Sequence, residues 1–371
     1  MRIRYPVEND DTLKTLQGFL QKILSERIVD VLLVPMRTPS GTITPALVSD
    51  PEMLVHADPL APVLPVNSAT LAGQVSMSKP RPKVGAVLRS CEMRALVELV
   101  KFQQACLEDM VLISVDCAGT YGVPKYLKMA ANSGISEENL WKNLFKTAIH
   151  DPEVGQEDLR QACKMCVQPV YDQAQIVIEL LGSNFNEEII ITLPDDLGEK
   201  LGLNPVETGQ REVVVEKLSK AHSTEREAEF ASIRERMDGK ENLTTIFAAC
   251  IRCHNCMTVC PICYCKTCVF KSQVFEHEPM QYLVWTQQKG AYRMPADTML
   301  FHLTRLNHMV LSCVGCGMCI EACPAELPVG TVFSVIGQQV QGVFNYLPGR
   351  NLDEKPPLVT FKADEWSEVG E

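Results

Sequence analysis

Two copies of one cysteine motif dominate the chemistry that this sequence could do. Each copy reads Cys-x2-Cys-x2-Cys-x3-Cys-Pro, and one begins at Cys250 and the other at Cys313. In this motif three closely spaced thiolates bind one 4Fe-4S cluster, and the fourth cysteine, before the proline, binds the other cluster. The spacing therefore predicts two clusters. The predicted ligands of the first cluster are Cys250, Cys253, Cys256 and Cys323, and those of the second cluster are Cys313, Cys316, Cys319 and Cys260.

Zinc is the alternative occupant of these motifs, because Cys-x2-Cys pairs also suit tetrahedral zinc. Two complete copies that each end in Cys-Pro favour iron-sulfur clusters instead. The chain has 16 cysteines among 371 residues. In a reducing cytosol such a clustered set indicates metal binding rather than disulfides.

A further group of cysteines lies outside the two motifs. Cys91 and Cys117 each follow a predicted strand, where open α/β sheets gather ligands, and Cys163-x2-Cys166 is a local chelating pair. Together they supply enough thiolates for a third 4Fe-4S cluster, although each thiol alone would be an ordinary buried cysteine. Cys106 is expected in a helix, as a core residue. Three more cysteines are expected to pack, or to form hydrogen bonds, near a cluster: Cys263, Cys265 and Cys268.

The elements that must position these cysteines alternate between helix and strand in the first half of the chain. Apolar spacing predicts helices over 12–28 and 92–104, the second after a polar turn at 89–90. Apolar and β-branched runs predict strands over 29–34, where Pro35 is expected to end the strand, and over 83–88, 110–115, 175–180, 188–192 and 213–215. Strands that alternate with helices predict an α/β domain with a mixed sheet.

The second half of the chain changes in character. We predict an α/β domain over 1–216, a charged, exposed linker helix over 217–245, a helical dicluster ferredoxin-like domain over 246–345, and a C-terminal tail over 346–371 that wraps or docks on a neighbouring element. Helical spacing over 298–311, between the two motifs, resembles the α-helical ferredoxin arrangement of succinate dehydrogenase iron-sulfur subunits and heterodisulfide reductase small subunits.

Composition narrows the classes of partner. The formal net charge of -11 argues against nucleic acid and against an anionic membrane surface as the main partner. No apolar run is long enough to cross a bilayer, and the N-terminus lacks the hydrophobic stretch of a signal peptide. We therefore expect a cytoplasmic protein with no membrane insertion. Neither a Gly-x-Gly-x-x-Gly fingerprint nor a Walker A loop is present.

Taken together, these residues resemble the coenzyme F-420 hydrogenase and dehydrogenase beta-subunit family, and within it the formate dehydrogenase branch. Segment 24–35 is similar to the family's first helix-strand unit, and 83–96 to its Gly-Thr-Pro-Cys loop and following helix. Segment 116–119 is similar to the family's Phe-Cys-x-Gly turn, with Asp116 in place of Phe. Cys163 and Cys166, followed by Asp172, are similar to its Cys-x2-Cys element. Segment 260–265 is similar to the formate dehydrogenase branch. The resemblance covers nearly the whole chain.

This resemblance implies that Cys91, Cys117, Cys163 and Cys166 bind a cluster next to FAD. It implies an electron-transfer subunit without catalytic residues of its own, whose partner is a catalytic molybdenum or tungsten formate dehydrogenase subunit or a hydrogenase subunit. The chain departs from the family at 88–91, which reads Leu-Arg-Ser-Cys, and at 11–14, where a Gly-Gly pair is missing. Two alternatives remain: a flavoenzyme subunit that itself reduces F-420 or NAD, and an adaptor to a heterodisulfide-reductase-like complex.

Overall fold

The computed structural model describes residues 1–80, 82–131, 137–153, 157–201, 205, 210–238, 242–290 and 296–359. The chain divides into two compact units. The first unit comprises Met1–Ala228, Val314–Gly317 and Pro348–Lys355, and the second comprises Glu229–Cys313, Met318–Leu347 and Pro356–Glu371. The chain therefore enters the first unit again for a short loop inside the second cysteine motif.

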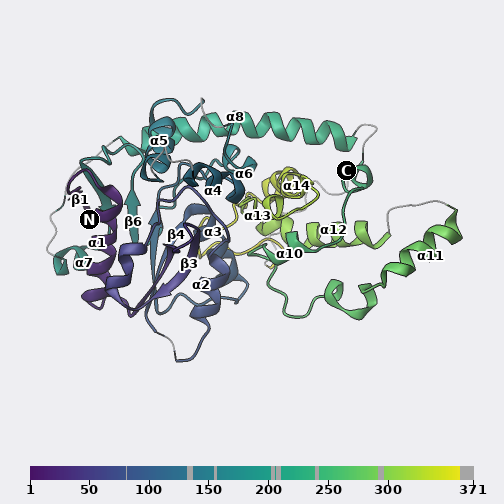
Figure 1. The fold of residues 1–371 in the computed structure, drawn as a ribbon, viewed down its shortest axis with the longest axis horizontal. Coiled ribbons are helices and arrows are strands. Elements are labelled where there is room, and N and C mark those ends of the chain that lie inside the picture. The colour runs from purple at the N-terminus through teal and green to yellow at the C-terminus, as the bar shows by residue number, and fades with distance from the viewer. Residues whose placement is uncertain are drawn as a thin grey trace. The chain divides into compact units, whose positions relative to one another are not determined.

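A mixed sheet of seven strands forms the centre of the first unit (Figure 1). The strands are β1 (Arg2–Pro6), β2 (Val31–Arg37), β3 (Ile43–Val48), β4 (Val84–Arg89), β5 (Met110–Val115), β6 (Ile176–Glu179) and β7 (Glu188–Thr192). Their order across the sheet is β1-β7-β6-β5-β4-β2-β3. The four neighbours β2, β4, β5 and β6 are parallel, whereas β1, β7 and β3 pair antiparallel. This confirms the predicted α/β class with a mixed sheet.

The helices of the first unit bury their apolar faces on this sheet. They are α1 (Thr12–Ser25), α2 (Ala69–Ser76), α3 (Ser90–Lys101), α4 (Val123–Ala131), α5 (Glu137–His150), α6 (Gln161–Lys164) and α7 (Asp195–Lys200), with a 3-10 turn η1 (Pro51–His56). Asp11 caps α1 by accepting a hydrogen bond from the Lys14 N–H, and Leu16, Leu20 and Ile23 then lie on one fully buried face. All six residues of β4 are buried, as expected for a strand covered on both faces.

Three local predictions in this unit are wrong, for identifiable reasons. Pro35 does not end β2, which continues to Arg37. The parallel pairing of β2 with β4 stops at Leu33. Beyond it β2 pairs with β3 in the register Pro35↔Pro45 and forms one isolated bridge, Met36↔Ala57, so the missing N–H of Pro35 interrupts no pairing with β4. The polar pair 89–90 is not a turn, because α3 begins at Ser90 directly after β4.

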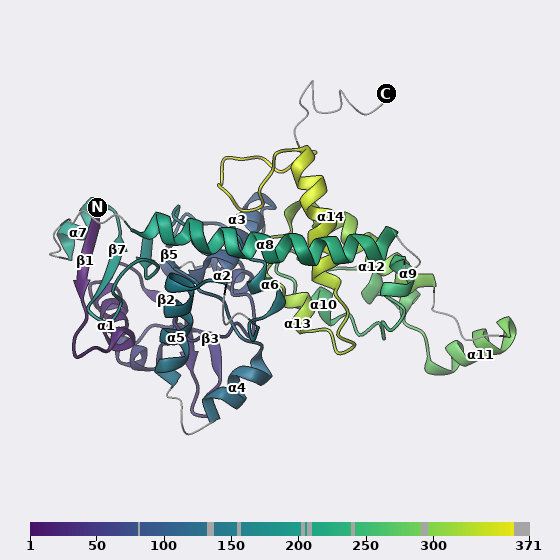
Figure 2. The same cartoon turned by 90° about the horizontal axis from the view of Figure 1, so that it is seen from above.

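The third correction concerns 213–215, which we predicted as a strand. These residues lie in α8 (Arg211–Asp238), a single long helix shown in Figure 2. The predicted linker helix over 217–245 therefore starts earlier, and residues 239–241 lie outside the described residues. It is also less exposed than predicted, because its few large side chains are buried: Leu218, His222, Phe230 and Ile233. The short β-branched run of α8 has no strand neighbour, and its helical neighbours determine its conformation.

The described residues of the second unit form helices and turns and no strands. Besides the end of α8, they form α9 (Leu243–Ile246), α10 (Asn255–Thr258), η2 (Val269–Lys271), η3 (Gln273–Phe275), α11 (Pro279–Lys289), α12 (Ala296–Met309), η4 (Val310–Ser312), α13 (Met318–Glu321) and α14 (Val329–Val343). The predicted helical C-terminal region is confirmed. Of the predicted tail, Pro348–Lys355 belongs to the first unit, where the Gly349 N–H donates to Glu98 on α3 at 2.7 Å. Residues 360–371 lie outside the described residues.

In the described part of the chain, no helix combines the length and the apolar character that crossing a membrane requires.

Candidate iron-sulfur sites

The sheet of the first unit determines where Cys91 and Cys117 lie. β4 and β5 are parallel neighbours, and their last residues, Arg89 and Val115, face each other in register. Cys91 follows β4 by two residues and Cys117 follows β5 by two residues. Both cysteines therefore emerge at the carboxyl edge of the sheet, where ligands bind in open α/β sheets. The sequence prediction that this edge gathers them is in agreement with the register.

The segment around α6 brings the Cys163 pair to the same edge. The Arg160 N–H donates to the Thr120 carbonyl at 2.9 Å, and the Cys117 N–H donates to the Pro169 carbonyl at 3.1 Å. These bonds fasten both ends of α6 to the chain after β5. As a result, Cys91, Cys117, Cys163 and Cys166 line one cavity in the first unit, which we call the first-unit cysteine cavity; its empty space is about 490 Å³.

Hydrogen bonds in this cavity are aimed at sulfur. The Gly119 N–H lies 3.4 Å from the Cys117 sulfur, and the Thr120 hydroxyl lies 3.2 Å from the Cys163 sulfur. Donors of this kind are one means by which proteins adjust the potential of an iron-sulfur cluster. On the outer side, His222 Nδ1 lies 2.7 Å from the Cys166 carbonyl, and burial lowers the pKa of His222, so this imidazole is neutral and can donate.

The thiols of this cavity resist ionisation by themselves. Burial raises the pKa of Cys91 and of Cys166, and it raises the pKa of Cys117 to about 12. The guanidinium groups of Arg89 and Arg94 oppose this effect, at Cys117 and Cys166 respectively. A bound metal centre reverses the balance, since a coordinating thiol is deprotonated outright. The buried thiols with cationic neighbours therefore fit an anionic metal cluster.

The loop Val314–Gly317 of the second motif belongs to this same unit. Two buried arginines hold it: Arg94 donates to the Val314 carbonyl at 2.9 Å, and Arg160 donates to the Cys316 carbonyl at 2.8 Å. Gly315 and Cys316 line the first-unit cysteine cavity. Cys316 thus lies beside the four cysteines predicted for the third cluster, a proximity that the sequence did not predict.

Gly317 makes this close packing possible, which gives a testable prediction. Its φ is +70°, and a Cβ added there would lie 2.2 Å from Ala162 Cβ, so Gly317→Ala should destabilise the first unit by about 1–3 kcal/mol. Gly315 is the matched control, because it has the same φ of +70° but no atom within 4 Å of an added Cβ. Thermal unfolding followed by circular dichroism should show a clearly larger fall in Tm for Gly317→Ala. Equal falls for both variants would mean that backbone strain, and not packing against α6, explains the effect.

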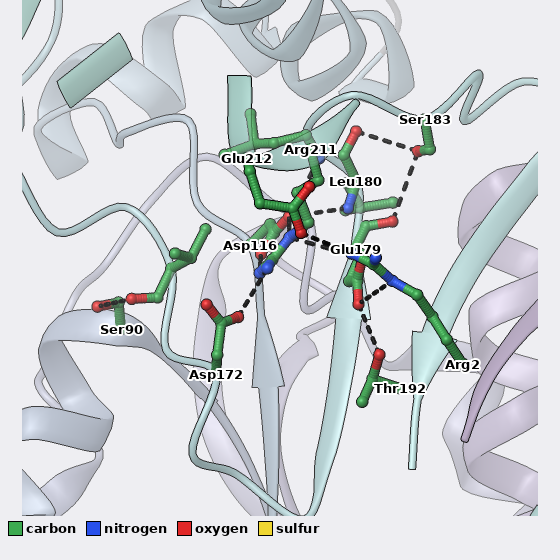
Figure 3. A network of polar contacts seen from close by, with 12 residues as sticks. Arg2, Ser90, Asp116, Asp172, Glu179, Leu180, Ser183, Thr192, Arg211 and Glu212 are labelled. Atoms are coloured by element: carbon green, nitrogen blue, oxygen red, sulfur yellow. Dashed lines mark hydrogen bonds and ion pairs between the residues drawn. The ribbon is translucent and has the colours of Figure 1, made fainter. Parts of the chain in front are cut away.

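A buried ion network supports the residue directly before Cys117. Asp116 accepts bonds from Arg211 Nη2 at 2.6 Å and Nε at 3.0 Å, and the Leu180 and Leu181 N–H groups donate to it at 3.1 Å (Figure 3). Arg211, at the start of α8, also pairs with Asp172 at 2.7 Å. Asp116 and Asp172 are thus joined through one guanidinium. The Asp116 carboxylate is therefore the anchor for Arg211.

The same network continues across the sheet. Glu179 at the end of β6 accepts from Arg2 on β1 at 2.5 Å and from the Thr192 hydroxyl at 2.7 Å. Its nearer oxygen lies 3.8 Å from Arg211. Burial raises the pKa of Asp116, and the Arg211 guanidinium opposes this shift. The charged form of this carboxylate therefore depends on Arg211. Polar contacts therefore fix the strand ends that carry the cavity.

The second unit contains the other cysteine cavity. Cys250, Cys253, Cys256 and Cys323 line one cavity, which we call the second-unit cysteine cavity. Its wall also includes Phe301, His302, Pro324, Ala325, Leu327 and Val329. The ligand set predicted for the first ferredoxin-type cluster is thus brought together around one space, with Cys253 exposed to solvent and Cys256 buried.

Donors again point at the sulfur atoms of this cavity. The Arg252 N–H lies 3.4 Å from the Cys250 sulfur, and the Leu327 N–H lies 3.4 Å from the Cys323 sulfur. His302 Nε2 lies 3.3 Å from the Cys250 sulfur, and its ring stacks on Phe247 with centroids 4.0 Å apart. Burial lowers the pKa of His302 to about 4, so the imidazole is neutral at pH 7. Arg252 is in the left-handed region at φ 56°, which turns its N–H toward the sulfur.

The remaining cysteines divide between the units. Cys260, Cys313 and Cys319 belong to the second unit and Cys316 to the first, so the second ferredoxin-type cluster stays a prediction from the motif. Burial raises the pKa of Cys263 to about 11, and the neighbouring thiols Cys260, Cys265 and Cys268 add to the shift.

Two of these cysteines have contacts of their own. The Cys268 thiol donates to the Met257 sulfur at 3.8 Å, a packing contact of the kind predicted. We predicted Cys106 in a helix, and this prediction is wrong. Cys106 lies half-buried in the loop after α3, where its N–H donates to the Ser76 hydroxyl at 3.0 Å.

The geometry bears on the zinc alternative. In a zinc site all sulfur ligands lie about 2.3 Å from one ion. In a 4Fe-4S cube each cysteine binds a different iron atom, so the four sulfur atoms lie farther apart. Among the described residues, no three histidine, cysteine or carboxylate side chains are close enough to hold a single ion. The cysteines instead surround cavities that also contain aromatic and backbone groups.

Sequence reasoning missed several of the residues around these sites. Arg160, His222 and His302 were not singled out. Only one local signal could have pointed to one of them: His302 lies one residue after Phe301 and three before Arg305, on the predicted helix between the motifs. Arg160 gave no signal, because its partner Cys316 is far away in the sequence.

Known proteins are similar both to the region of the two cysteine motifs and to most of the chain. Residues 243–324 match the family model of the 4Fe-4S dicluster domain. The chain is 23% identical over 344 residues to the F420-dependent formate dehydrogenase subunit beta of Methanocaldococcus jannaschii, which covers 85% of each chain. It is 25% identical over 309 residues to the F420-dependent formate dehydrogenase 1 subunit beta of Methanococcus maripaludis, and this match covers 75% of each of the two chains. These relatives confirm the resemblance seen in the sequence.

Among solved structures, a chain of the F420-reducing NiFe hydrogenase complex from Methanosarcina barkeri is similar at 13% identity with a TM-score of 0.46. The match covers 67% of this chain and 96% of that chain.

Proposed function

We propose that this chain is the iron-sulfur electron-transfer subunit of a cytoplasmic oxidoreductase of the formate dehydrogenase type. The observation that carries the proposal is the gathering of two predicted ligand sets around two separate cavities, each with hydrogen-bond donors aimed at sulfur. The dicluster domain match and the similarity to formate dehydrogenase beta subunits support the same function.

The proposed ligand sets follow the motifs and the cavities. One cluster would bind Cys250, Cys253, Cys256 and Cys323, and another Cys313, Cys316, Cys319 and Cys260. The third would bind Cys91, Cys117, Cys163 and Cys166. Such clusters supply one-electron transfer when bound. The chain's own residues hold them, exclude water and place cationic or N–H groups near the added charge.

The primary oxidation is proposed to occur on a partner, a catalytic molybdenum or tungsten formate dehydrogenase subunit or a hydrogenase subunit. Relatives are named as subunits of F420-dependent formate dehydrogenase, which supports such a partner. An adaptor role toward heterodisulfide-reductase-like subunits would use the same clusters, and isolation of the native complex by affinity purification would reveal those subunits instead.

We also propose that the first unit binds FAD next to the third cluster. A second cavity shares Arg89, Cys117 and Gly119 with the first-unit cysteine cavity and is walled by Pro59, Leu60, Trp141 and Phe145. The Trp141 indole N–H has no hydrogen-bond partner in the part of the chain that the structure describes, so it is available to a ligand. A flavin supplies the exchange between two-electron and one-electron chemistry.

Reduction of the clusters by formate tests the proposal. In anaerobic absorption measurements, formate should bleach the visible bands of this chain only when the catalytic subunit is added. Bleaching by formate without the partner would contradict the proposal, and so would an unchanged spectrum in the presence of an active partner. Bleaching by reduced F-420 or NADH without any partner would identify the alternative function, a flavoenzyme subunit that reacts with these carriers itself.

A further inference from the structure

α12 buries a mixed face and exposes two leucines. Along this helix Phe301, His302 and Arg305 are 1%, 1% and 4% exposed, whereas Leu300 and Leu303 are 50% and 45% exposed. The buried face thus includes two polar side chains, His302 and Arg305, and both lie beside cysteine sulfurs.

Arg305 makes the closest of these contacts. Its Nη1 lies 3.1 Å from the Cys256 sulfur, and its Nη2 donates to the Cys256 carbonyl at 3.0 Å. The guanidinium also lies between two rings, 5.5 Å from the Phe301 centroid and 5.3 Å from the Phe333 centroid. The side chain is thus fixed on three sides, with its planar fork directed at one cysteine.

The charge of Arg305 has no ordinary counter-ion. Within the described ranges no carboxylate lies within ion-pair distance of its guanidinium, and its Nε has no hydrogen-bond partner. Its guanidinium interacts electrostatically with the thiols of Cys256, Cys260, Cys319 and Cys263, and also with the imidazoles of His254 and His302. A buried cation without compensation is strongly unfavourable, and thiolates that ligate the proposed clusters would supply the compensating negative charge.

The thiols that Arg305 faces come from both predicted ferredoxin-type ligand sets. Cys256 belongs to the set of Cys250, and Cys260 and Cys319 belong to the set of Cys313. All three lie in the second unit together with Arg305. One cation therefore faces sulfur ligands of two clusters.

We propose that Arg305 is a positioning residue that raises the reduction potentials of both ferredoxin-type clusters together. The inference rests on the proposed function. Each cluster accepts one electron, which comes from the catalytic partner, and one negative charge is added to the cluster. Arg305 keeps its proton throughout, because a guanidinium is not deprotonated in proteins. Its fixed positive charge favours the reduced form at either cluster.

Redox titration of three variants tests this role, with the low-temperature paramagnetic signals of the reduced protein as the readout. Arg305→Gln should lower the reduced-to-oxidised ratio of both clusters at least tenfold at a fixed ambient potential, a shift of about 59 mV for one electron. Arg305→Lys retains the charge and should remain much closer to the wild type. Lys289→Gln removes an exposed cation from the same unit and should change neither potential, since solvent and salt screen it.

Different failures separate the inference from the proposed function. Wild-type protein without cluster signals would contradict the proposed function itself. Wild-type signals with unchanged potentials in Arg305→Gln, or a shift at one cluster only, would overturn the inference alone. If Arg305→Gln fails to assemble its clusters, Arg305→Lys decides: assembled clusters with potentials near the wild type support the role of the charge, and potentials as low as those expected for the glutamine variant contradict it.

Discussion

Replacing Cys163 by alanine should lower the iron content of the anaerobically purified chain by about a third, from about twelve to about eight atoms. Cys163 lines the first-unit cysteine cavity with four other cysteines, and its sulfur lies 3.2 Å from the Thr120 hydroxyl. Loss of one thiolate leaves an iron corner without its protein ligand, and the buried neighbouring thiols do not ionise without the metal. Iron and acid-labile sulfide analysis measures the effect directly.

Cys106→Ala is the matched control for this experiment. Cys106 is a half-buried cysteine of the same unit that does not line the cavity. Its replacement should leave the iron content unchanged, and both variants should keep the two ferredoxin-type paramagnetic signals. Full iron content in Cys163→Ala would show that the third ligand set is wrong.

The second large effect is expected at Arg211. Arg211→Met leaves Asp116 buried without its guanidinium partner, and breaking a buried ion pair from one side costs about 3–5 kcal/mol. Because Asp116 accepts from two N–H groups at the end of β6, the loss should appear in the opening of β5 and β6. Hydrogen exchange of the amides in these two strands measures that local free energy without requiring the two units to unfold together.

Arg4→Gln controls for the general effect of removing an arginine from the sheet. Arg4 pairs with Glu188 at 2.6 Å, but its side chain is 52% exposed, and such pairs contribute about 1 kcal/mol or less. A double variant, Arg211→Met with Asp116→Leu, should recover part of the loss, since it removes the unpaired charge. A loss in Arg211→Met no larger than in Arg4→Gln would contradict the anchoring role of Asp116.

The sequence was sufficient where a single pattern determines the outcome. β5 and β7 have the predicted bounds, because each is a short, mainly apolar and β-branched run between polar residues. Cys250, Cys253, Cys256 and Cys323 line one cavity, in agreement with the grouping that their motif spacing predicts. Cys91 and Cys117 could be placed at one edge because parallel strands end together.

The sequence was insufficient where tertiary contacts decide. The 213–215 run has the composition of a strand but lies in α8, which starts at Arg211, the partner of Asp116. β1 went unnoticed, since its alternation of apolar and charged residues is short and its partner β7 is distant in the sequence. The apolar spacing of 298–311 correctly predicted a helix, but Leu300 and Leu303 face solvent and Arg305 faces the cysteines. No periodicity encodes that choice.

The return of Val314–Gly317 to the first unit could not be inferred from either half of the chain alone. It depends on Arg94 and Arg160, which are separated from this loop by 220 and 156 residues, and on a glycine that leaves room for α6. The consequence concerns function. The second cysteine motif supplies a wall residue, Cys316, to the cavity predicted to hold the third cluster.

Native mass spectrometry of the anaerobically purified wild-type chain tests the central claim most directly, because one mass counts clusters and flavin together. The proposed electron-transfer subunit predicts a mass that exceeds the polypeptide by three 4Fe-4S clusters and one FAD. A mass with two clusters and no flavin would contradict the proposed third cluster and FAD and reduce the first unit to a docking scaffold. A mass with zinc or without any cluster would contradict the electron-transfer function itself.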